Sequence, residues 1–149
     1  MINMKEIIVT QQQLNKQNKI PPGSILYFIR LLLISLGTLA VAIEPHTFQG
    51  HGYSVVDYTL LFIPFFLYII AMIFLFNRSK PFFYITHMIF GYNLILLILT
   101  FTPYFIEENH ILPFLCAFDF LMVLYLHKSA RAAMFYKYRN VLVIEEEER

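Results

Sequence analysis

The chain has 149 residues, of which 58% are hydrophobic and 17% aromatic, while only 14% are charged, and its net charge is +1 with a mean hydropathy of +0.62. A water-soluble domain of this length needs more polar side chains to cover its surface, so the composition excludes an ordinary soluble protein and indicates an exterior that faces lipid. The single cysteine, Cys116, excludes an intramolecular disulfide and CxxC chemistry.

Four apolar stretches are long enough, or nearly so, to cross a bilayer as helices, which takes about 20 residues at about 1.5 Å each. We place them at about Ile25 to Ile43, Tyr58 to Phe76, Phe82 to Phe101 and Ile111 to His127. Apolar residues run around every face of these stretches, unlike an amphipathic helix of a soluble protein. The predicted fold is therefore an all-α integral membrane protein with four transmembrane helices arranged as two hairpins.

Breaks rich in proline and polar residues divide the chain. Residues 1–23 are expected to form a polar cytoplasmic N-terminal tail, residues 24–128 the four-helix transmembrane domain, and residues 129–149 a basic and then acidic cytoplasmic C-terminal tail.

The orientation follows from the placement of the cations. All 11 lysines and arginines lie on one side of the four-span arrangement, and the loops at residues 44–57 and 102–110 contain none. The positive-inside rule places that side in the cytoplasm, with both termini. Arg78, Lys80, Lys128 and Arg131 are predicted basic anchors. Their expected partner is the bilayer, through anionic head groups of the inner leaflet, and no nucleic acid partner is expected.

An alternative concerns the first span. Arg30, the apolar run that follows it and Ala40-Val41-Ala42 resemble the charged, apolar and cleavage-site parts of a secretory signal peptide. Cleavage after Ala42 would leave three spans with the N-terminus outside. The apolar stretch begins before Arg30 and a long tail precedes it, which favours an uncut span.

Three ionisable residues lie within the spans, namely Arg30, His87 and Asp119. Such groups are costly in hydrocarbon, so each is expected to face the bundle interior or to reach an interface. At about 1.5 Å per residue, the three lie at similar depths, and Tyr68 of the second span has a similar height. We predict an intramembrane polar cluster of these four residues. Three roles of this cluster stay open. It could be an ion pair that fixes helix register, its Arg30 could instead extend to the membrane interface, or it could be a proton relay or substrate site.

Small and polar side chains form two helix-packing stripes. Ser35, Thr38 and Ala42 share a face of the first span, and Thr86, Asn93 and Thr100 recur every seven residues on the third. Such stripes are typical of close helix contacts in membranes. A homo-oligomer or an interface with another membrane protein is the alternative.

The predicted outer loops contain three histidines and several carboxylates, which are potential ligands of a divalent metal. His46, His51 and His110 are the weak candidates, but their spacing matches no compact metal motif. No metal and no cofactor are therefore expected. The sequence also contains none of the common hydrolase, metalloprotease or nucleotide-binding motifs, so no catalytic residue and no enzyme activity are predicted.

Two stretches carry a family resemblance: LFNRSKPFFYITHMIFGYN (Leu75 to Asn93) and LYLHKSARAAMF (Leu124 to Phe135). They are similar to the second-to-third span junction and the fourth-span exit of the YdgK-like family of small bacterial inner-membrane proteins, also called domain of unknown function 2569. The first span has Tyr27 and Phe28 near the place where that family usually has a Gly-Trp pair. The resemblance implies a four-span protein of the bacterial inner membrane, and it supplies no activity or catalytic residue.

Two functions are compatible with these expectations. The first is a structural or accessory component without enzyme activity that binds a partner in the membrane. The alternative is a small oligomeric transporter, or an ion- or proton-conducting protein, that uses Asp119 and His87.

Overall fold

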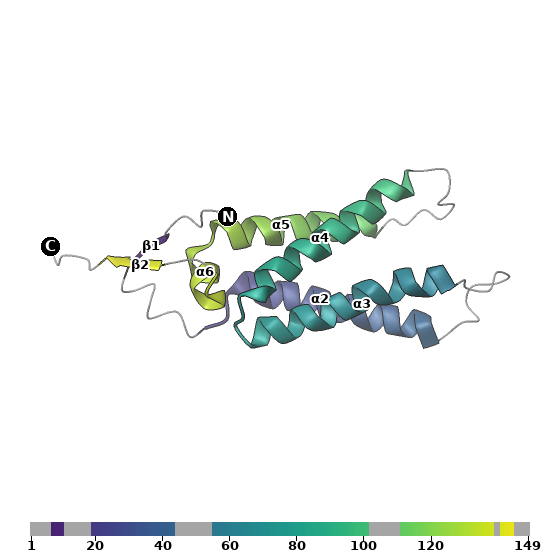
Figure 1. The fold of residues 1–149 in the computed structure, drawn as a ribbon, viewed down its shortest axis with the longest axis horizontal. Helices are drawn as coiled ribbons and strands as arrows, with labels where there is room; N and C mark the ends of the chain where they lie inside the picture. Colours follow the sequence, from purple (N-terminus) through teal and green to yellow (C-terminus); the bar gives the residue numbers. More distant parts are fainter. Residues whose placement is uncertain (1–6, 11–18, 44–54, 102–110, 139–140, 145–149) are drawn as a thin grey trace.

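Four long helices run back and forth along an elongated molecule (Figure 1). The computed structural model describes residues 7–10, 19–43, 55–101, 111–138 and 141–144, and it places side chains at 19–40, 59, 62–101 and 111–138. The long helices are α2 (Pro22–Ile43), α3 (Val55–Phe76), α4 (Pro81–Thr100) and α5 (Leu112–Lys128). Each packs against the next along the chain, whereas α2 and α5 touch only sparsely.

Prolines and a hydroxyl group mark the helix ends. Pro22 and Pro81 are the first residues of α2 and α4, where the missing N–H group costs no helical hydrogen bond. Arg78, with a φ of 50°, turns the chain between α3 and α4. Ser129 ends α5 in an extended conformation and caps the next helix, because its Oγ accepts a hydrogen bond from the Ala132 N–H at 3.2 Å.

The segment after α5 folds back onto the bundle. Helix α6 (Ala130–Tyr136) is bent by 86° from α5 and lies across one end of the four helices (Figure 1). Its residues Ala132 to Tyr136 are all buried. Beyond it, β2 (Val141–Ile144) pairs in parallel with β1 (Ile7–Thr10). The packed domain therefore extends past residue 128, where the sequence predicted a tail to begin.

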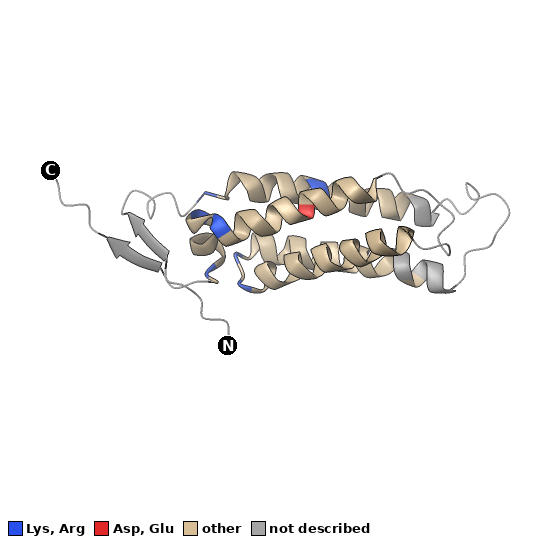
Figure 2. Cartoon of the chain, turned by 90° about the horizontal axis from the view of Figure 1, so that it is seen from above, with Lys and Arg blue, Asp and Glu red and all other residues tan. Residues whose placement is uncertain are grey.

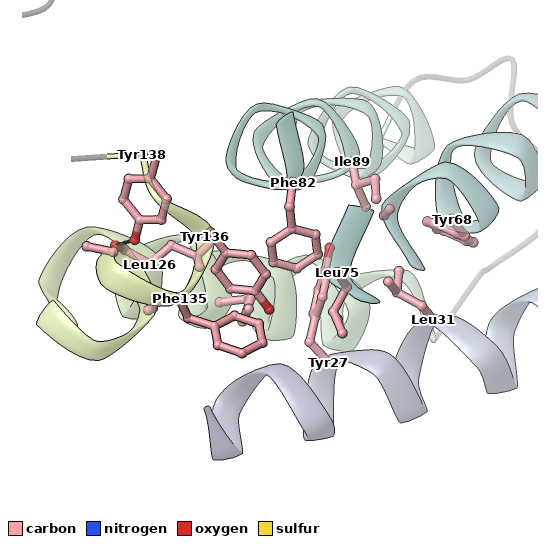
Figure 3. Close-up of a cluster of buried hydrophobic side chains, with 14 residues drawn as sticks. Tyr27, Leu31, Tyr68, Leu75, Phe82, Ile89, Leu126, Phe135, Tyr136 and Tyr138 are labelled. Carbon is pink, nitrogen blue, oxygen red and sulfur yellow. Dashed lines mark hydrogen bonds between the residues drawn. The ribbon is translucent and has the colours of Figure 1, made fainter. Parts of the chain in front are cut away.

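An aromatic core joins α6 to the long helices (Figure 3). The rings of Phe82 and Tyr136 stack with their centroids 4.4 Å apart, and Tyr27 meets Phe82 edge to face at 6.2 Å. The Tyr136 hydroxyl donates a hydrogen bond to Ser24 Oγ at 2.7 Å. Tyr138 donates to the backbone carbonyl of Leu126. Since these contacts come from α2, α4, α5 and α6, they fix the end of the bundle.

Among the residues that the structure describes, two helices are long and apolar enough to cross a bilayer, Pro22–Ala40 within α2 and Pro81–Thr100. A third candidate exists if α5 and α6 are taken as one bent span. Within α3, the described apolar helix Phe62–Phe76 is shorter. Many large apolar side chains on these helices are exposed, including Leu33, Phe66 and Ile95 at 62%, 59% and 59%. In a chain of this composition, such surfaces fit lipid contact.

Candidate functional site: a buried polar cluster

An ion pair lies in the middle of the bundle. Figure 2 shows basic and acidic positions side by side there, while most other described basic positions gather at the end near α6. Arg30 Nη2 on α2 donates to Asp119 Oδ2 on α5 at 2.7 Å, and the two side chains are 7% and 0% exposed. Each charge alone would cost about 2.5 to 3.5 kcal/mol in hydrocarbon on insertion scales, so their contact offsets a large desolvation penalty.

The two remaining long helices also contact this pair. Asn93 Nδ2 on α4 donates to the same Asp119 oxygen at 2.7 Å and lies 3.5 Å from the Tyr68 hydroxyl on α3. The Arg30 guanidinium packs over the rings of Tyr68 and Tyr27, with its Cζ 4.8 and 5.8 Å from their centroids. We call Tyr27, Arg30, Tyr68, Asn93 and Asp119 the core polar cluster. It draws on all four long helices.

Several atoms of this cluster keep hydrogen-bonding capacity. Asp119 Oδ2 receives both Arg30 and Asn93, while Oδ1 has no hydrogen-bond partner among the residues that the structure describes. The same holds, within that part of the chain, for Arg30 Nε and Nη1. The Tyr27 hydroxyl is buried beside the Asp119 carboxylate and interacts with it. Ser35 Oγ, one residue of a predicted packing stripe, is also buried without such a partner there. The core is thus richer in donors and acceptors than its bonds require.

His87 lies apart from this cluster, contrary to the prediction. Its Nδ1 is 2.6 Å from the Phe83 carbonyl oxygen and its Nε2 is 2.9 Å from His127 Nε2 on α5. Because the carbonyl can only accept, Nδ1 carries the proton, and in a neutral His87 ring Nε2 accepts from His127. The depth estimate carried no information on the side of α4 that His87 occupies.

Of the six predicted packing residues, Asn93 bonds to another helix. Thr38, Thr86 and Thr100 donate to the carbonyl oxygens of Ile34, Phe82 and Leu97 on their own helices. The side chain of Ala42 lies outside the described residues. Asn93 was predicted as a packing residue and not as a member of the charged cluster, although its amide in an apolar helix at this depth was the available signal.

The predicted basic anchors lie at the α6 end of the molecule. Arg78 packs over the ring of Phe135 with its Cζ 4.7 Å from the centroid. Arg131 Nη2 donates to the Lys19 carbonyl oxygen at 3.3 Å, which ties α6 to the segment before α2. Lys80 and Lys128 are exposed.

The weak metal candidates His46, His51 and His110 lie outside the described residues. Within the described part of the chain, no group of three or more histidine, cysteine or acidic side chains is placed to hold a metal ion. Cys116 is a buried free thiol.

No family model, curated protein or solved structure matches the chain.

Proposed function

We propose that the chain is a four-span protein of the bacterial inner membrane, with both tails on the cytoplasmic side. The antiparallel course of α2 to α5 supports four spans (Figure 1). Helix α5 has 17 residues, and at about 1.5 Å each it covers about 25 Å, close to the hydrocarbon thickness. Helix α3 has 22 residues. The contacts of Arg78 with Phe135 and of Arg131 with Lys19 support a single basic face.

An uncut first span is part of this proposal. Helix α2 supplies Arg30, the partner of Asp119, and Tyr27 and Leu31 are fully buried. Signal cleavage after Ala42 would remove Arg30 and leave Asp119 unpaired in the core, which is costly. The intact mass of the protein purified from membranes tests this point, because cleavage would shorten the chain by 42 residues.

The function that the geometry supports best is a structural or accessory component that binds another membrane protein. The observation that carries this proposal is the core polar cluster. Its acid and base are almost fully buried and bonded to each other, and Asn93 and Tyr68 contact them, so the cluster as a whole holds four helices in register. The outward faces of α2 to α5 are apolar, as a surface for lipid or a partner helix requires.

Purification from the native membrane in a mild detergent tests the accessory role. We expect a membrane protein in stoichiometric amount with the chain, and its loss when an outward residue at the contact is replaced by a bulkier one. The chain reconstituted alone in liposomes should show no ion flux. A lone homo-oligomer with flux that disappears in Asp119→Asn would contradict the accessory role.

That outcome would support the second candidate, a small oligomeric transporter or proton conductor. The unpartnered atoms around Asp119 favour it, since a proton or a small polar solute needs free donors and acceptors. The position of His87 beside His127 argues against the predicted use of Asp119 and His87 in one path.

We also propose membership of the YdgK-like family. Its support is the two stretches that carry the resemblance, because they meet in space. Arg78 of the first stretch packs on Phe135 of the second, and Phe82 stacks on Tyr136, which directly follows it. A pattern shared by both stretches therefore has a physical reason, namely the docking of α6 on the turn between α3 and α4.

A further inference from the structure

An apolar groove lies between α2 and α5, the two long helices that touch only sparsely. Its volume is about 220 Å³, and its lining residues are Gly23, Leu26, Phe118, Leu121, Met122 and Tyr125. Leu26 and Leu121 stay 60% and 63% exposed, so the groove opens to the outside of the bundle. An apolar cavity of about 150 Å³ accommodates benzene, so this groove has room for a segment of an acyl chain.

Gly23 sets the shape of the groove near the α6 end. A methyl group on Gly23 would lie 2.9 Å from the Tyr125 ring, closer than packing allows. The glycine therefore lets the ring lie directly against the first turn of α2. Any larger residue there would push Tyr125 into the groove or separate the two helices.

Basic side chains stand at the same end of the groove. Leu121, Tyr125 and Lys128 are spaced by four and three residues, so they share one side of α5, with Lys128 at its end. Arg131 contacts Lys19, four residues before Gly23. In the described part of the chain, Lys19, Lys128 and Arg131 form no ion pair, and Arg131 Nε is buried without a hydrogen-bond partner.

We infer that this groove is a binding site for one anionic phospholipid of the leaflet on the α6 side. An acyl chain lies against Leu26, Leu121 and Tyr125, and the phosphate is held by Lys128 and Arg131 with Lys19 nearby. The charge complementarity selects a lipid over an uncharged partner helix, since an apolar groove that ends in basic side chains matches an acyl chain that ends in a phosphate. The inference rests on the membrane-spanning part of the proposed function and not on the accessory role.

The test uses the full chain purified in a mild detergent and native mass spectrometry with two lipids of equal chain length. We expect one dioleoylphosphatidylglycerol to bind saturably per chain, and dioleoylphosphatidylcholine to bind more weakly. Each Lys or Arg near a membrane surface contributes about 1 kcal/mol, so Lys128→Gln and Arg131→Gln should each reduce the preference for the anionic lipid about fivefold. Lys80→Gln removes a cation at the same end but away from the groove and should leave the preference unchanged.

A second experiment fills the groove with a larger side chain. Leu121→Trp should weaken binding of both lipids, because the larger side chain occupies the space of the acyl chain. Leu36→Trp is the matched control, since Leu36 is 55% exposed on α2 and does not line the groove. Leu36→Trp should bind both lipids as the unmodified chain does.

Two results would overturn the inference. Equal, non-saturating binding of both lipids would mean only a general lipid coat. A dimer that Leu121→Trp dissociates, with lipid binding unaffected, would mean that a second copy occupies the groove. Both results are separable from a failure of the membrane assignment, in which the chain would stay monodisperse without detergent.

Discussion

Asp119 is fully buried in the middle of α5, and its carboxylate is compatible with that position because Arg30 and Asn93 both bond to it. A buried pair of this kind adds little stability relative to an apolar pair of the same shape. Removing one partner is different, because the other charge stays in a low dielectric without compensation. The pair therefore specifies the relative position of α2 and α5 more than it strengthens the bundle.

The first prediction follows from this asymmetry. Asp119→Asn and Arg30→Gln should each lower the stability of the detergent-solubilised protein by about 3 kcal/mol, because each leaves one unpaired charge. The double change should cost clearly less than the sum of the two single changes. Thermal unfolding of all four proteins measures this coupling, with Lys80→Gln as an exposed-cation control. Unchanged melting temperatures in both single variants would show that the Arg30–Asp119 pair does not fix the position of α2 against α5.

The second prediction separates two residues of one predicted stripe. Asn93 is 2% exposed and bonds to a charged group on another helix, whereas Thr100 bonds to Leu97 on its own helix. Hydrogen bonds to charged groups contribute about 1.5 to 3 kcal/mol, while the average in membrane bundles is about 0.6. Asn93→Leu should therefore destabilise the protein by about 1.5 kcal/mol or more, and Thr100→Val by well under 1 kcal/mol. Equal losses in thermal unfolding would contradict this assignment.

For single residues, the sequence predicted the depth of a side chain along its helix better than the side of the helix on which it lies. Counting residues from the span ends placed Arg30 and Asp119 at compatible heights, and the structure pairs them. The same count put His87 nearby. On a helix, however, His87 is rotated by about 100° from Thr86, which lies on the same face of α4 as Asn93 of the core polar cluster. His87 therefore faces His127 and not the cluster. Only the packing of α4 between its neighbours determines which side faces the charge pair, and residue spacing within one helix carries no such information.

Helix α6 shows where a sequence pattern is too short to be read. Its seven residues lie within a basic stretch that an acidic run follows, so the whole segment resembles a polar tail. The available signal was Ser129, because a serine before a mostly apolar run is typical of a helix N-cap. The core position of Tyr136 depends on Phe82 and Ser24, and that of Phe135 involves Arg78, all remote in the sequence. Such contacts cannot be inferred from local periodicity.

The third prediction tests α6 as an element. Ending the chain after Tyr138 removes β2 and the acidic residues but keeps the buried side chains of α6. Ending it after Lys128 removes them and exposes Phe82 and Leu126, which are both fully buried in the intact chain. We expect near-normal membrane abundance and melting temperature for the longer form, and a large loss of both for the shorter form. Equal behaviour of the two truncations would exclude a structural role of α6.

At the scale of the whole molecule, the set of long helices and their bounds follow most directly from the sequence. Continuous apolar runs bounded by prolines predicted helix bounds close to those observed, for example Phe82 to Phe101 against Pro81–Thr100. Length and hydropathy are properties of each segment alone, so they can be read without knowing its neighbours. The sparse contact between α2 and α5, which opens the groove, is a property of the assembled bundle and has no signature in any one segment.

The fourth prediction concerns the orientation of the whole chain. In a Cys116→Ala background, a cysteine at Asn77 lies in the turn between α3 and α4, and a cysteine at Gln49 lies in the connection between α2 and α3. We expect the cations beside Asn77 to keep that turn on the cytoplasmic side, because basic loops are retained there, whereas the connection at Gln49 contains none. A membrane-impermeant maleimide should therefore label Gln49→Cys in cells with a permeable outer layer, and Asn77→Cys only after lysis. The reverse pattern would invert the orientation, and labelling of both without lysis would mean that α3 does not cross the membrane.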